Sequence, residues 1–370
     1  MAESEARLVP EVDVACAACG QAAADEICSA EQLVRQAEIA RRFHTARLRR
    51  RSRAALEERA SFTHGYATRL LACRACRLLY RSPRPAAGAL LDAYEGERYA
   101  AERLPQMVAS QRALFRPKAR ALARSLRSAA RVLEVGSFVG GFLWAAREAG
   151  LDAVGIDPSE QLSSLCRRSG LRVARCTLEQ AADSSAESHY DAVAIWNTFD
   201  QFPRPREALR AVLRLLRPGG LVLLRFPHGS YFRHLAHWDP VQVRALAWNN
   251  LLAFPYLHGY GLRSLDGLVR EFGLTRIGVE GDTLGAVADA SYARWARLEE
   301  STVKLAQRAR WARDLSLAPW LDVALRDTRV ASSAASATLS TSAGSGVGER
   351  KHRGARRLRV APVSQTKGKP

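Results

Sequence analysis

The stretch of sequence that decides the fold is Val132-Leu133-Glu134-Val135-Gly136-Ser137-Phe138-Val139-Gly140-Gly141-Phe142. It predicts a short apolar strand that enters a glycine-containing turn, and the turn opens a helix. Glycine allows the backbone to turn tightly and allows a ligand to approach without a Cβ in the way. Asp157 ends the next predicted strand, 153–157, where a carboxylate can accept both hydroxyls of a ribose. The stretch therefore predicts a nucleoside-binding turn.

Strands and helices alternate on both sides of this turn. Strands are predicted over 131–135, 153–157, 171–175, 190–196, 221–226 and 275–280. Helices are predicted over 90–99, 107–127, 140–149, 159–169, 205–216, 262–271 and 292–315, and an Arg-rich helix over 33–59. This alternation implies an α/β fold with a doubly wound, mostly parallel sheet that is covered on both faces.

The composition is that of a globular protein. Of the 370 residues, 47% are apolar and 25% are charged, which argues against disorder throughout the chain. No apolar run reaches the roughly 18 residues that a bilayer crossing needs. The N-terminal residues are acidic and lack the apolar region of a secretory signal. A cytoplasmic location is the expectation.

The net charge of +19 is concentrated in two segments. Residues 30–70 carry ten Arg and four Glu, and residues 330–370 carry eight Lys or Arg and one Glu. Nearly all basic residues are Arg, a usage that GC-rich coding also produces. Basic segments can attract phosphate-bearing partners, so nucleic acid stays open as a partner.

Four of the seven cysteines form two Cys-x-x-Cys pairs, Cys16 with Cys19 and Cys73 with Cys76. Two such knuckles can complete a tetrahedral zinc site. The intervening residues 20–72 exceed the usual ribbon spacing of about 15–20, and the Arg-rich helix fills the gap. Since all four thiolates would be ligands, the metal would be structural. Free buried thiols or a redox dithiol are the alternatives.

The turn also discriminates between nucleoside cofactors. Phe138 stands where a dinucleotide-binding turn has its second glycine, and its side chain crowds a pyrophosphate. Glu134 would repel a phosphate but could hold a cationic amine. S-adenosylmethionine carries an α-amino group, a sulfonium and no phosphate. The electrostatics favour it over NAD.

Three motifs carry a family resemblance: Glu134-Val-Gly-Ser-Phe-Val-Gly-Gly, Val154-Gly-Ile-Asp157-Pro-Ser, and Tyr190-Asp-Ala-Val-Ala-Ile-Trp followed by Leu216-Arg-Pro-Gly-Gly-Leu221. In order and spacing, over roughly 110–290, they resemble class I S-adenosylmethionine-dependent methyltransferases. The run from Cys73 to Pro85, with Tyr94 and Tyr99, is similar to the subgroup with an N-terminal zinc ribbon. The chain departs from it at Phe138 and in the long basic insertion, and nothing in the sequence resembles the further C-terminal domain of sugar C-methyltransferases.

The resemblance implies a Rossmann-like methyltransferase fold and a set of cofactor contacts. The methionine moiety would lie against the turn, the ribose against Asp157, the adenine beside the following loops, and the sulfonium near the end of the fourth strand. The implied cofactor-binding residues are Glu134, Gly136, Ser137, Gly140, Asp157, Pro158, Leu178, Glu179 and Trp196.

The acceptor side is less specified. His228 follows the fifth predicted strand, and His258 lies in an aromatic stretch that runs to Tyr260. Either imidazole could act as a general base near neutral pH. Methyl transfer also proceeds largely by in-line positioning, so a base can be dispensable.

These patterns predict four regions: a zinc-ribbon region with an Arg-rich insertion (1–86), a cofactor-binding domain (87–290), a C-terminal helix (291–330) and a disordered basic tail (331–370). The predicted activity is methyl transfer to a small-molecule, sugar or lipid-type acceptor. An RNA methyltransferase that grips RNA with its ribbon and basic helix, and a non-catalytic cofactor-binding scaffold, are the alternatives.

Overall fold

A computed structural model describes residues 13–49, 66–96, 98–185, 190–234, 240–254, 256–284 and 292–329. Its main sheet has seven strands in the order β10-β11-β8-β7-β4-β5-β6. The strands are β4 (Arg131–Val135), β5 (Asp152–Ile156), β6 (Val173–Ala174), β7 (Tyr190–Trp196), β8 (Leu216–Pro227), β10 (Leu274–Asp282) and β11 (Trp320–Asp327). β4 to β8 pair in parallel, whereas β11 pairs antiparallel with both β8 and β10. The expected doubly wound, mostly parallel, Rossmann-like sheet is confirmed.

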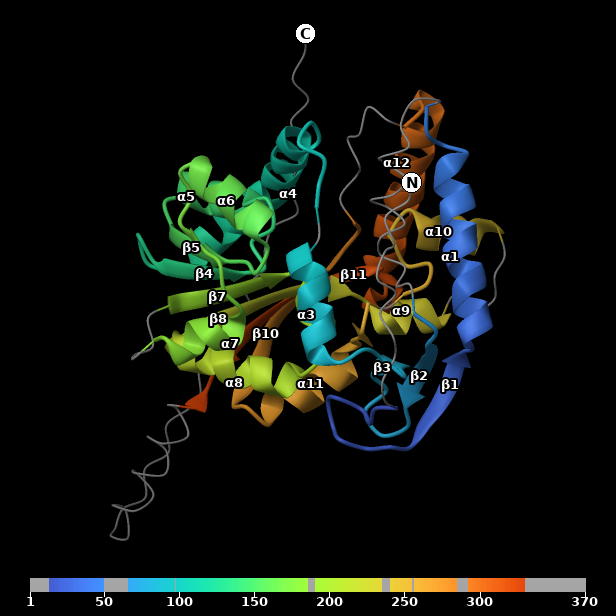
Figure 1. Ribbon diagram of the computed structural model, residues 1–370, viewed down its shortest axis with the longest axis horizontal. Helices are drawn as coiled ribbons and strands as arrows, with labels where there is room; N and C mark the ends of the chain where they lie inside the picture. Colours follow the sequence, from blue (N-terminus) through green and yellow to red (C-terminus); the bar gives the residue numbers. More distant parts are fainter. Residues whose placement is uncertain are drawn as a thin grey trace, which may run out of the picture. The chain divides into compact units, whose positions relative to one another are not determined.

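Helices cover both faces of this sheet (Figure 1). One face carries α4 (Leu104–Ser125), α5 (Gly141–Glu148) and α6 (Glu160–Arg168). The other carries α7 (Leu178–Asp183), α8 (Pro205–Leu215) and α11 (Leu262–Arg270). Each layer buries an apolar cluster against the sheet, around Phe142 and Val132 on the first face and around Leu209 and Leu224 on the second. Because both faces are buried, the central strands are almost uninterruptedly apolar.

A second, four-stranded sheet has the order β1-β2-β3-β9, all antiparallel. Its strands are β1 (Ala24–Cys28), β2 (Arg69–Cys73), β3 (Leu79–Ser82) and β9 (His258–Gly259). β9 comes from the aromatic stretch far along the chain. Main-chain hydrogen bonds between β3 and β9 thus join the N-terminal region to residues that were predicted to belong to the cofactor-binding domain.

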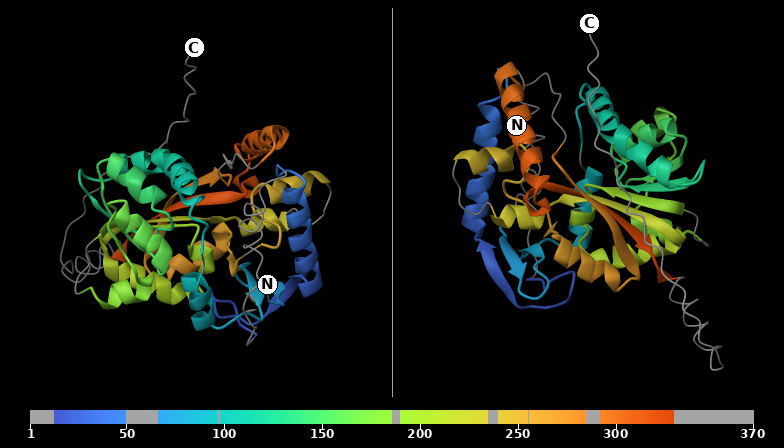
Figure 2. Two further views of the ribbon diagram at one scale, coloured as in Figure 1. Left: turned by 45° about the horizontal axis from the view of Figure 1, so that its top comes forward. Right: turned by 180° about the vertical axis from the view of Figure 1, so that it is seen from behind.

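The remaining elements are α1 (Ala30–Thr45), α3 (Ala87–Gly96), η1 (Phe199–Gln201), α9 (Gly229–His234), α10 (Pro240–Ala247), α12 (Arg294–Trp311) and η2 (Leu315–Leu317). α1 and α12 lie side by side (Figures 1 and 2), and the bridge between Leu48 and Tyr292 joins the end of one to the start of the other. None of the helices that the structure describes combines the length and apolar character that a membrane crossing requires.

Two predictions are wrong, one about the type of an element and one about the length of a helix. The region 291–330 is not simply a helix, because α12 ends at Trp311 and β11 inserts between β8 and β10. In β11, Leu321, Val323 and Leu325 alternate into the core while the side chains between them are less buried. This period of two identifies a strand. The Arg-rich helix stops at Thr45, since α1 ends there; 50–65 and the basic tail 331–370 lie outside the described residues.

Candidate active site

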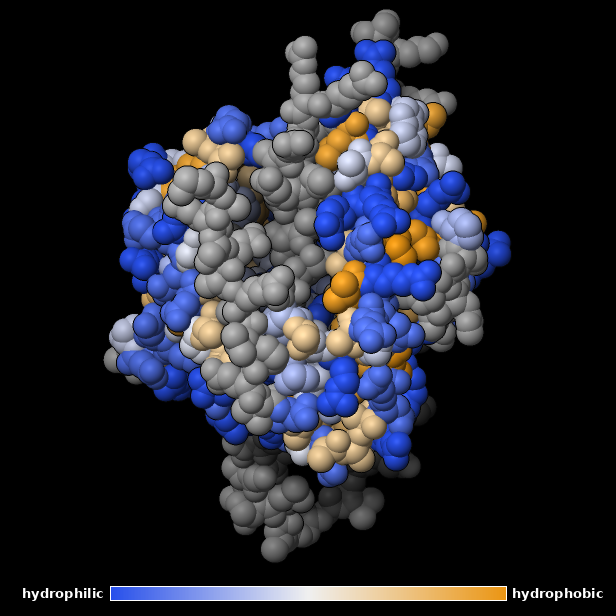
Figure 3. Space-filling model, turned by 45° about the vertical axis from the view of Figure 1, so that its right-hand side comes forward, coloured by the Kyte–Doolittle hydropathy of each residue, from blue (hydrophilic) through white to orange (hydrophobic). Residues whose placement is uncertain are grey.

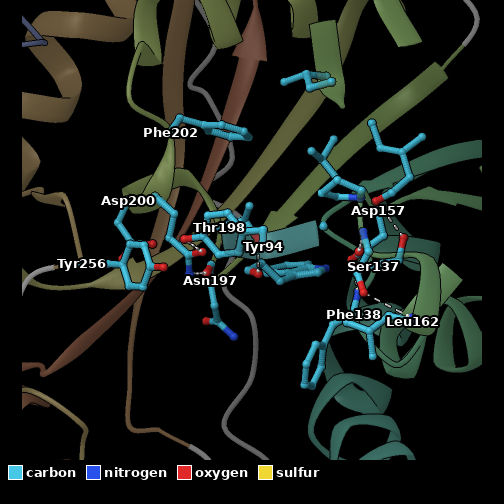
Figure 4. Close-up of a pocket in the computed structure, with 18 of the residues that line it drawn as sticks. Tyr94, Ser137, Phe138, Asp157, Leu162, Asn197, Thr198, Asp200, Phe202 and Tyr256 are labelled. Carbon is cyan, nitrogen blue, oxygen red and sulfur yellow. Dashed lines mark hydrogen bonds between the residues drawn. The ribbon is translucent and has the colours of Figure 1, made fainter. Parts of the chain in front are cut away.

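A cavity of about 660 Å³ lies at the carboxyl ends of the central parallel strands. This is where doubly wound sheets bind their ligands, because the loops diverge where the strand order reverses. The loops after β4, β5 and β6 line one side, and α3, the loop after β7 and residues 250, 252–254 and 256 line the other. Figure 4 shows Ser137, Phe138 and Asp157 on one side and Asp200 and Tyr256 on the other.

The glycine turn after β4 is tightly constrained. Gly136 has φ +73°, and a Cβ at this position would lie 2.6 Å from Thr198 Oγ1. Phe138 has φ +50°, the left-handed region that a non-glycine residue rarely adopts. Its ring lies edge-on to Tyr99, with centroids 5.3 Å apart. The turn therefore accommodates the bulky residue by turning its side chain onto an aromatic neighbour.

Asp157 holds the turn in place. Its Oδ2 accepts a hydrogen bond from Phe138 N at 2.8 Å, and its Oδ1 accepts one from Ser159 N at 2.9 Å. The side chain is buried at the cavity wall. Carboxylate oxygens can each accept more than one hydrogen bond. Asp157 thus joins the loops after β4 and β5 and still faces the cavity.

Glu134 is a buried acid at the carboxyl end of β4. Burial raises the pKa of Glu134 well above its usual range, and the nearby Asp157 raises it further. Its Oε2 has no hydrogen-bond partner among the described residues. Leaving a buried carboxyl oxygen unpartnered is costly, and a cationic or hydrogen-bonding ligand group in the cavity would remove that cost.

Most of the residues predicted to contact the cofactor come together here. Those that line the cavity are Glu134, Gly136, Ser137, Asp157, Pro158, Leu178, Glu179 and Trp196. Gly140 does not line it. It caps α5 with φ +76°, and a Cβ there would meet the Leu171 side chain at 2.4 Å. Its role in the structure is to let α5 begin close to a neighbouring loop.

Trp196 ends β7 and lies within the apolar cluster under α4 and α5. Its ring is 5.5 Å from Phe115 and 5.4 Å from Phe142 between centroids. Its Nε1 has no hydrogen-bond partner among the described residues. Trp196 is therefore both a core residue and part of the cavity wall.

Neither predicted histidine borders the cavity. His228 is buried, with Nδ1 3.0 Å from the Ala318 carbonyl oxygen. His258 is fully buried in β9, with Nε2 2.9 Å from Arg84 Nη1. Burial, together with the Arg84 charge, lowers the pKa of His258 to about 3. The prediction of either as a catalytic base is not supported by their positions, because both rings serve packing between elements that are distant in the sequence.

The acid that does reach the far side of the cavity is Asp200, in η1. Its side chain is 4% exposed, and Oδ1 has no partner among the described residues. Burial raises the pKa of Asp200 to about 8. The sequence analysis expected the sulfonium near the end of the fourth strand, but only the structure singles out this carboxyl.

Aromatic side chains dominate this far side. Tyr94 of α3 stacks on Tyr256, with ring centroids 5.7 Å apart, and its hydroxyl donates to Gln201 Oε1 at 2.8 Å. Phe202, Phe254 and Trp320 line the same part of the cavity. The sequence analysis did not predict that α3 and β11 contribute to this wall. Its only indication was the pair Tyr94 and Tyr99 in the family resemblance.

The four knuckle cysteines form a separate cluster. The sulfur atoms of Cys16, Cys19, Cys73 and Cys76 all lie within 4.8 Å of one another. The knuckles share one backbone geometry, since Gly20 N donates to Cys16 O and Arg77 N donates to Cys73 O. Both following residues are left-handed, Gly20 at φ +77° and Arg77 at φ +69°. Cys28 is not part of this cluster, and its sulfur accepts a hydrogen bond from Gln36.

This cluster is packed against the main domain. Arg206 of α8 donates to the Ala18 carbonyl at 2.9 Å, and Arg263 of α11 donates to the Ala75 carbonyl at 3.2 Å. Cys16, Cys73 and Tyr80 belong to the same buried apolar cluster as the strands of the main sheet. The N-terminal region therefore shares its core with the sheet.

Comparisons with known proteins find similar proteins for part of the chain. Residues 107–277 match a family model described as a methyltransferase domain. A ubiquinone biosynthesis O-methyltransferase of Methylococcus capsulatus is 37% identical over 98 residues, which are 25% of this chain and 41% of that protein. The match thus spans about two fifths of the relative's length.

Two solved structures are similar at lower identity. A SAM-dependent methyltransferase from Archaeoglobus fulgidus is 16% identical, with 58% of this chain and 94% of that chain covered and a TM-score of 0.42. The plantazolicin methyltransferase BamL, in complex with a triazolic desmethylPZN analog and SAH, is 13% identical, with 65% and 91% covered and a TM-score of 0.38. Both TM-scores are below 0.5.

Proposed function

We propose that this chain is an S-adenosylmethionine-dependent methyltransferase that acts on a small-molecule or lipid-type acceptor. The observation that carries the proposal is the constellation of Glu134, Gly136 and Asp157, which opens into one cavity with an unpartnered carboxyl oxygen. The match of residues 107–277 to a methyltransferase domain supports it. The name of the Methylococcus relative, an O-methyltransferase of ubiquinone biosynthesis, supports a small-molecule acceptor.

The residues present fit this cofactor. Glu134 would accept hydrogen bonds from the cofactor's ammonium group, and the Asp157 carboxylate would accept hydrogen bonds from the ribose hydroxyls. Pro158, Leu178 and Glu179 would flank the adenine. When bound, S-adenosylmethionine supplies an electrophilic methyl group on a sulfonium. The apolar wall around Trp196 would exclude water from that methyl group, and desolvation favours transfer to the acceptor.

Asp200 replaces the two histidines as the proposed proton acceptor. Its carboxyl borders the aromatic side of the cavity, where the acceptor must lie if the cofactor occupies the glycine-turn side. Asp200 would take the proton of an acceptor hydroxyl while the methyl group passes from sulfur to that oxygen and the carbon–sulfur electron pair stays on sulfur. A carboxyl with a pKa of about 8 is matched to this task near neutral pH. The stacked Tyr94 and Tyr256 suit an acceptor with a flat, largely apolar ring.

Calorimetry with S-adenosylmethionine tests the cofactor assignment. Wild type should bind, and Glu134→Gln should bind about tenfold or more weakly, since a hydrogen bond to a charged group is worth about 1.5–3 kcal/mol. Asp183→Asn, an exposed acid on α7 paired with Arg214, is the matched control and should bind like wild type. Absence of binding by wild type would contradict the proposal.

Turnover with labelled cofactor separates the alternatives. A methylated small molecule in extracts supplied with the protein would support the proposed acceptor class. Cofactor binding with no product, together with capture of a partner, would instead favour the non-catalytic scaffold. Labelled RNA, with RNA binding that weakens steeply with salt, would favour the RNA methyltransferase.

We also propose that 1–86 is a zinc-ribbon region whose metal is structural. Four thiolates at about 2.3 Å from one Zn²⁺ would have their sulfur atoms well within the 4.8 Å seen here. With four protein ligands no position is left for a substrate, and metal binding would hold the two knuckles together.

Elemental analysis of protein never exposed to chelator should find about one zinc per chain. Cys73→Ser should lower thermal stability before it lowers cofactor affinity, because the knuckle packs on the main core while lying apart from the cavity. Cys28→Ser, at the thiol outside the cluster, is the control and should retain zinc. Less than about half an equivalent of zinc, with all four thiols reactive, would contradict a ribbon.

A further inference from the structure

The helix α12 buries several polar side chains and exposes several large apolar ones. Its inward side buries Glu300, Lys304 and Gln307. Lys304 pairs with Glu300, and Gln307 hydrogen-bonds Tyr231 and Asn249. Its outward side carries large apolar side chains, with Trp295 54%, Leu298 70% and Leu305 69% exposed. A surface helix normally presents these two kinds of residue the other way round.

The outward apolar residues form one stripe. Leu298 and Leu305 are seven residues apart, which is two helical turns, so their side chains point the same way. Trp295 lies one turn before Leu298 on the same side. Over ten residues the stripe spans roughly 15 Å. Val34 of the adjacent helix α1 is 68% exposed as well. Figure 3 shows apolar patches between hydrophilic side chains on the side where α1 and α12 lie.

On α12, the charged residues without an ion pair among the described residues are all arginines. Arg294, Arg297, Arg308 and Arg310 lie on α12, and none of them has an ion pair among the described residues. The acids of the helix are already neutralised. Glu299 pairs with Arg47 and Arg244, and Glu300 pairs with Lys304. The exposed side of α12 thus offers apolar contact and positive charge, and no acid.

We propose that α12 docks this protein on an anionic lipid surface, with Trp295, Leu298 and Leu305 in the headgroup region and the flanking arginines on lipid phosphates. A helix of this pattern binds in the plane of the interface. Tryptophan suits the boundary between apolar and wet layers. A second copy of this chain fits less well, because it would bring two sets of unpaired arginines together. The inference stands on α12 alone and goes beyond the proposed methyl transfer.

Sedimentation of the full chain with vesicles tests the proposal. Wild type should bind phosphatidylcholine vesicles that contain phosphatidylglycerol, bind pure phosphatidylcholine weakly, and lose affinity as salt rises. The double variant Leu298→Asp with Leu305→Asp should bind about tenfold or more weakly. In the double variant Arg308→Gln with Arg310→Gln, the affinity for vesicles should fall about fivefold for each charge removed. Ile277→Asp, at an exposed apolar residue of β10, is the control and should bind like wild type.

A second readout follows Trp295 itself. Spin-labelled lipids should quench part of the wild-type tryptophan fluorescence, and Trp295→Phe should remove that quenched part. Wild-type affinity in the leucine double variant, with its melting temperature unchanged, would overturn the proposal in favour of attraction by charge elsewhere. A wild-type dimer that the double variant converts to a monomer, with no vesicle binding, would overturn it in favour of a second copy.

Discussion

The two sides of the cavity are built in different ways. The glycine-turn side comes from three consecutive strand–loop–helix units that begin with β4, β5 and β6, and backbone hydrogen bonds to Asp157 join the first two. The aromatic side is assembled from α3, η1, residues 250, 252–254 and 256, and β11, which are far apart in the sequence. The first side is held by backbone geometry and the second by side-chain packing. We therefore expect changes on the first side to act on cofactor affinity, and changes on the second to act on turnover and acceptor binding.

Asp200→Asn should have the largest effect. The amide cannot accept a proton, so kcat should fall about 100-fold or more, as for removal of a general base, while cofactor affinity stays near wild type. Because the carboxyl must be ionised to act and its pKa is about 8, wild-type kcat/KM should rise with pH through that region. The variant's profile should lose this step. Steady-state kinetics between pH 6 and 9 measure it, and a retained step would assign the titration to another group.

Gly136→Ala should weaken cofactor binding by about tenfold or more. A left-handed φ costs alanine about 1 kcal/mol, and its Cβ would also lie 2.6 Å from Thr198 Oγ1. Gly150→Ala is the matched control, because Gly150 has φ +82° and no atom within 4 Å of the added Cβ. Calorimetry should find the loss only at position 136. Equal affinities in the two variants would show that the close contact at Gly136 does not matter.

Tyr94→Ala should raise the acceptor KM by about fivefold, since an aromatic pair is worth about 0.5–1.5 kcal/mol. It removes both the stack on Tyr256 and the hydrogen bond to Gln201. Tyr94→Phe keeps the ring and should change KM less. A fall in cofactor affinity, with acceptor KM unchanged, would place Tyr94 functionally on the other side of the cavity.

Phe138→Gly should have the smallest effect. Glycine relieves a left-handed φ at a gain of about 1 kcal/mol, but the contact with Tyr99 is lost at a similar cost. Thermal unfolding should shift by a few degrees at most. Tyr99→Ala, which loses the same contact without relieving the backbone, should melt lower than Phe138→Gly. The opposite order would mean that the left-handed residue is not strained.

The glycine-turn side could be predicted from the sequence because its determinants are local. A strand, a turn with Gly136 and a helix follow one another without interruption, and Asp157 ends the very next strand. The knuckle spacing acts in the same way for Cys16 with Cys19 and for Cys73 with Cys76, which fix two pairs of thiols before any tertiary contact forms. In such patterns the residues are close in the sequence, so the local backbone conformation is enough to bring them together.

The tertiary structure alone decided the rest, because burial depends on partners that are distant in the sequence. His258 and Asp200 are both titratable residues in aromatic surroundings, yet β9 buries the first beside Arg84 and η1 places the second at the cavity. Whether β11 is a strand depends on the gap between β8 and β10. In α12 the neighbours reverse the expected sidedness, because Tyr231 and Asn249 receive its polar side and leave its leucines exposed. Where a residue's local sequence pattern and its tertiary contacts favour different structures, the tertiary contacts decide.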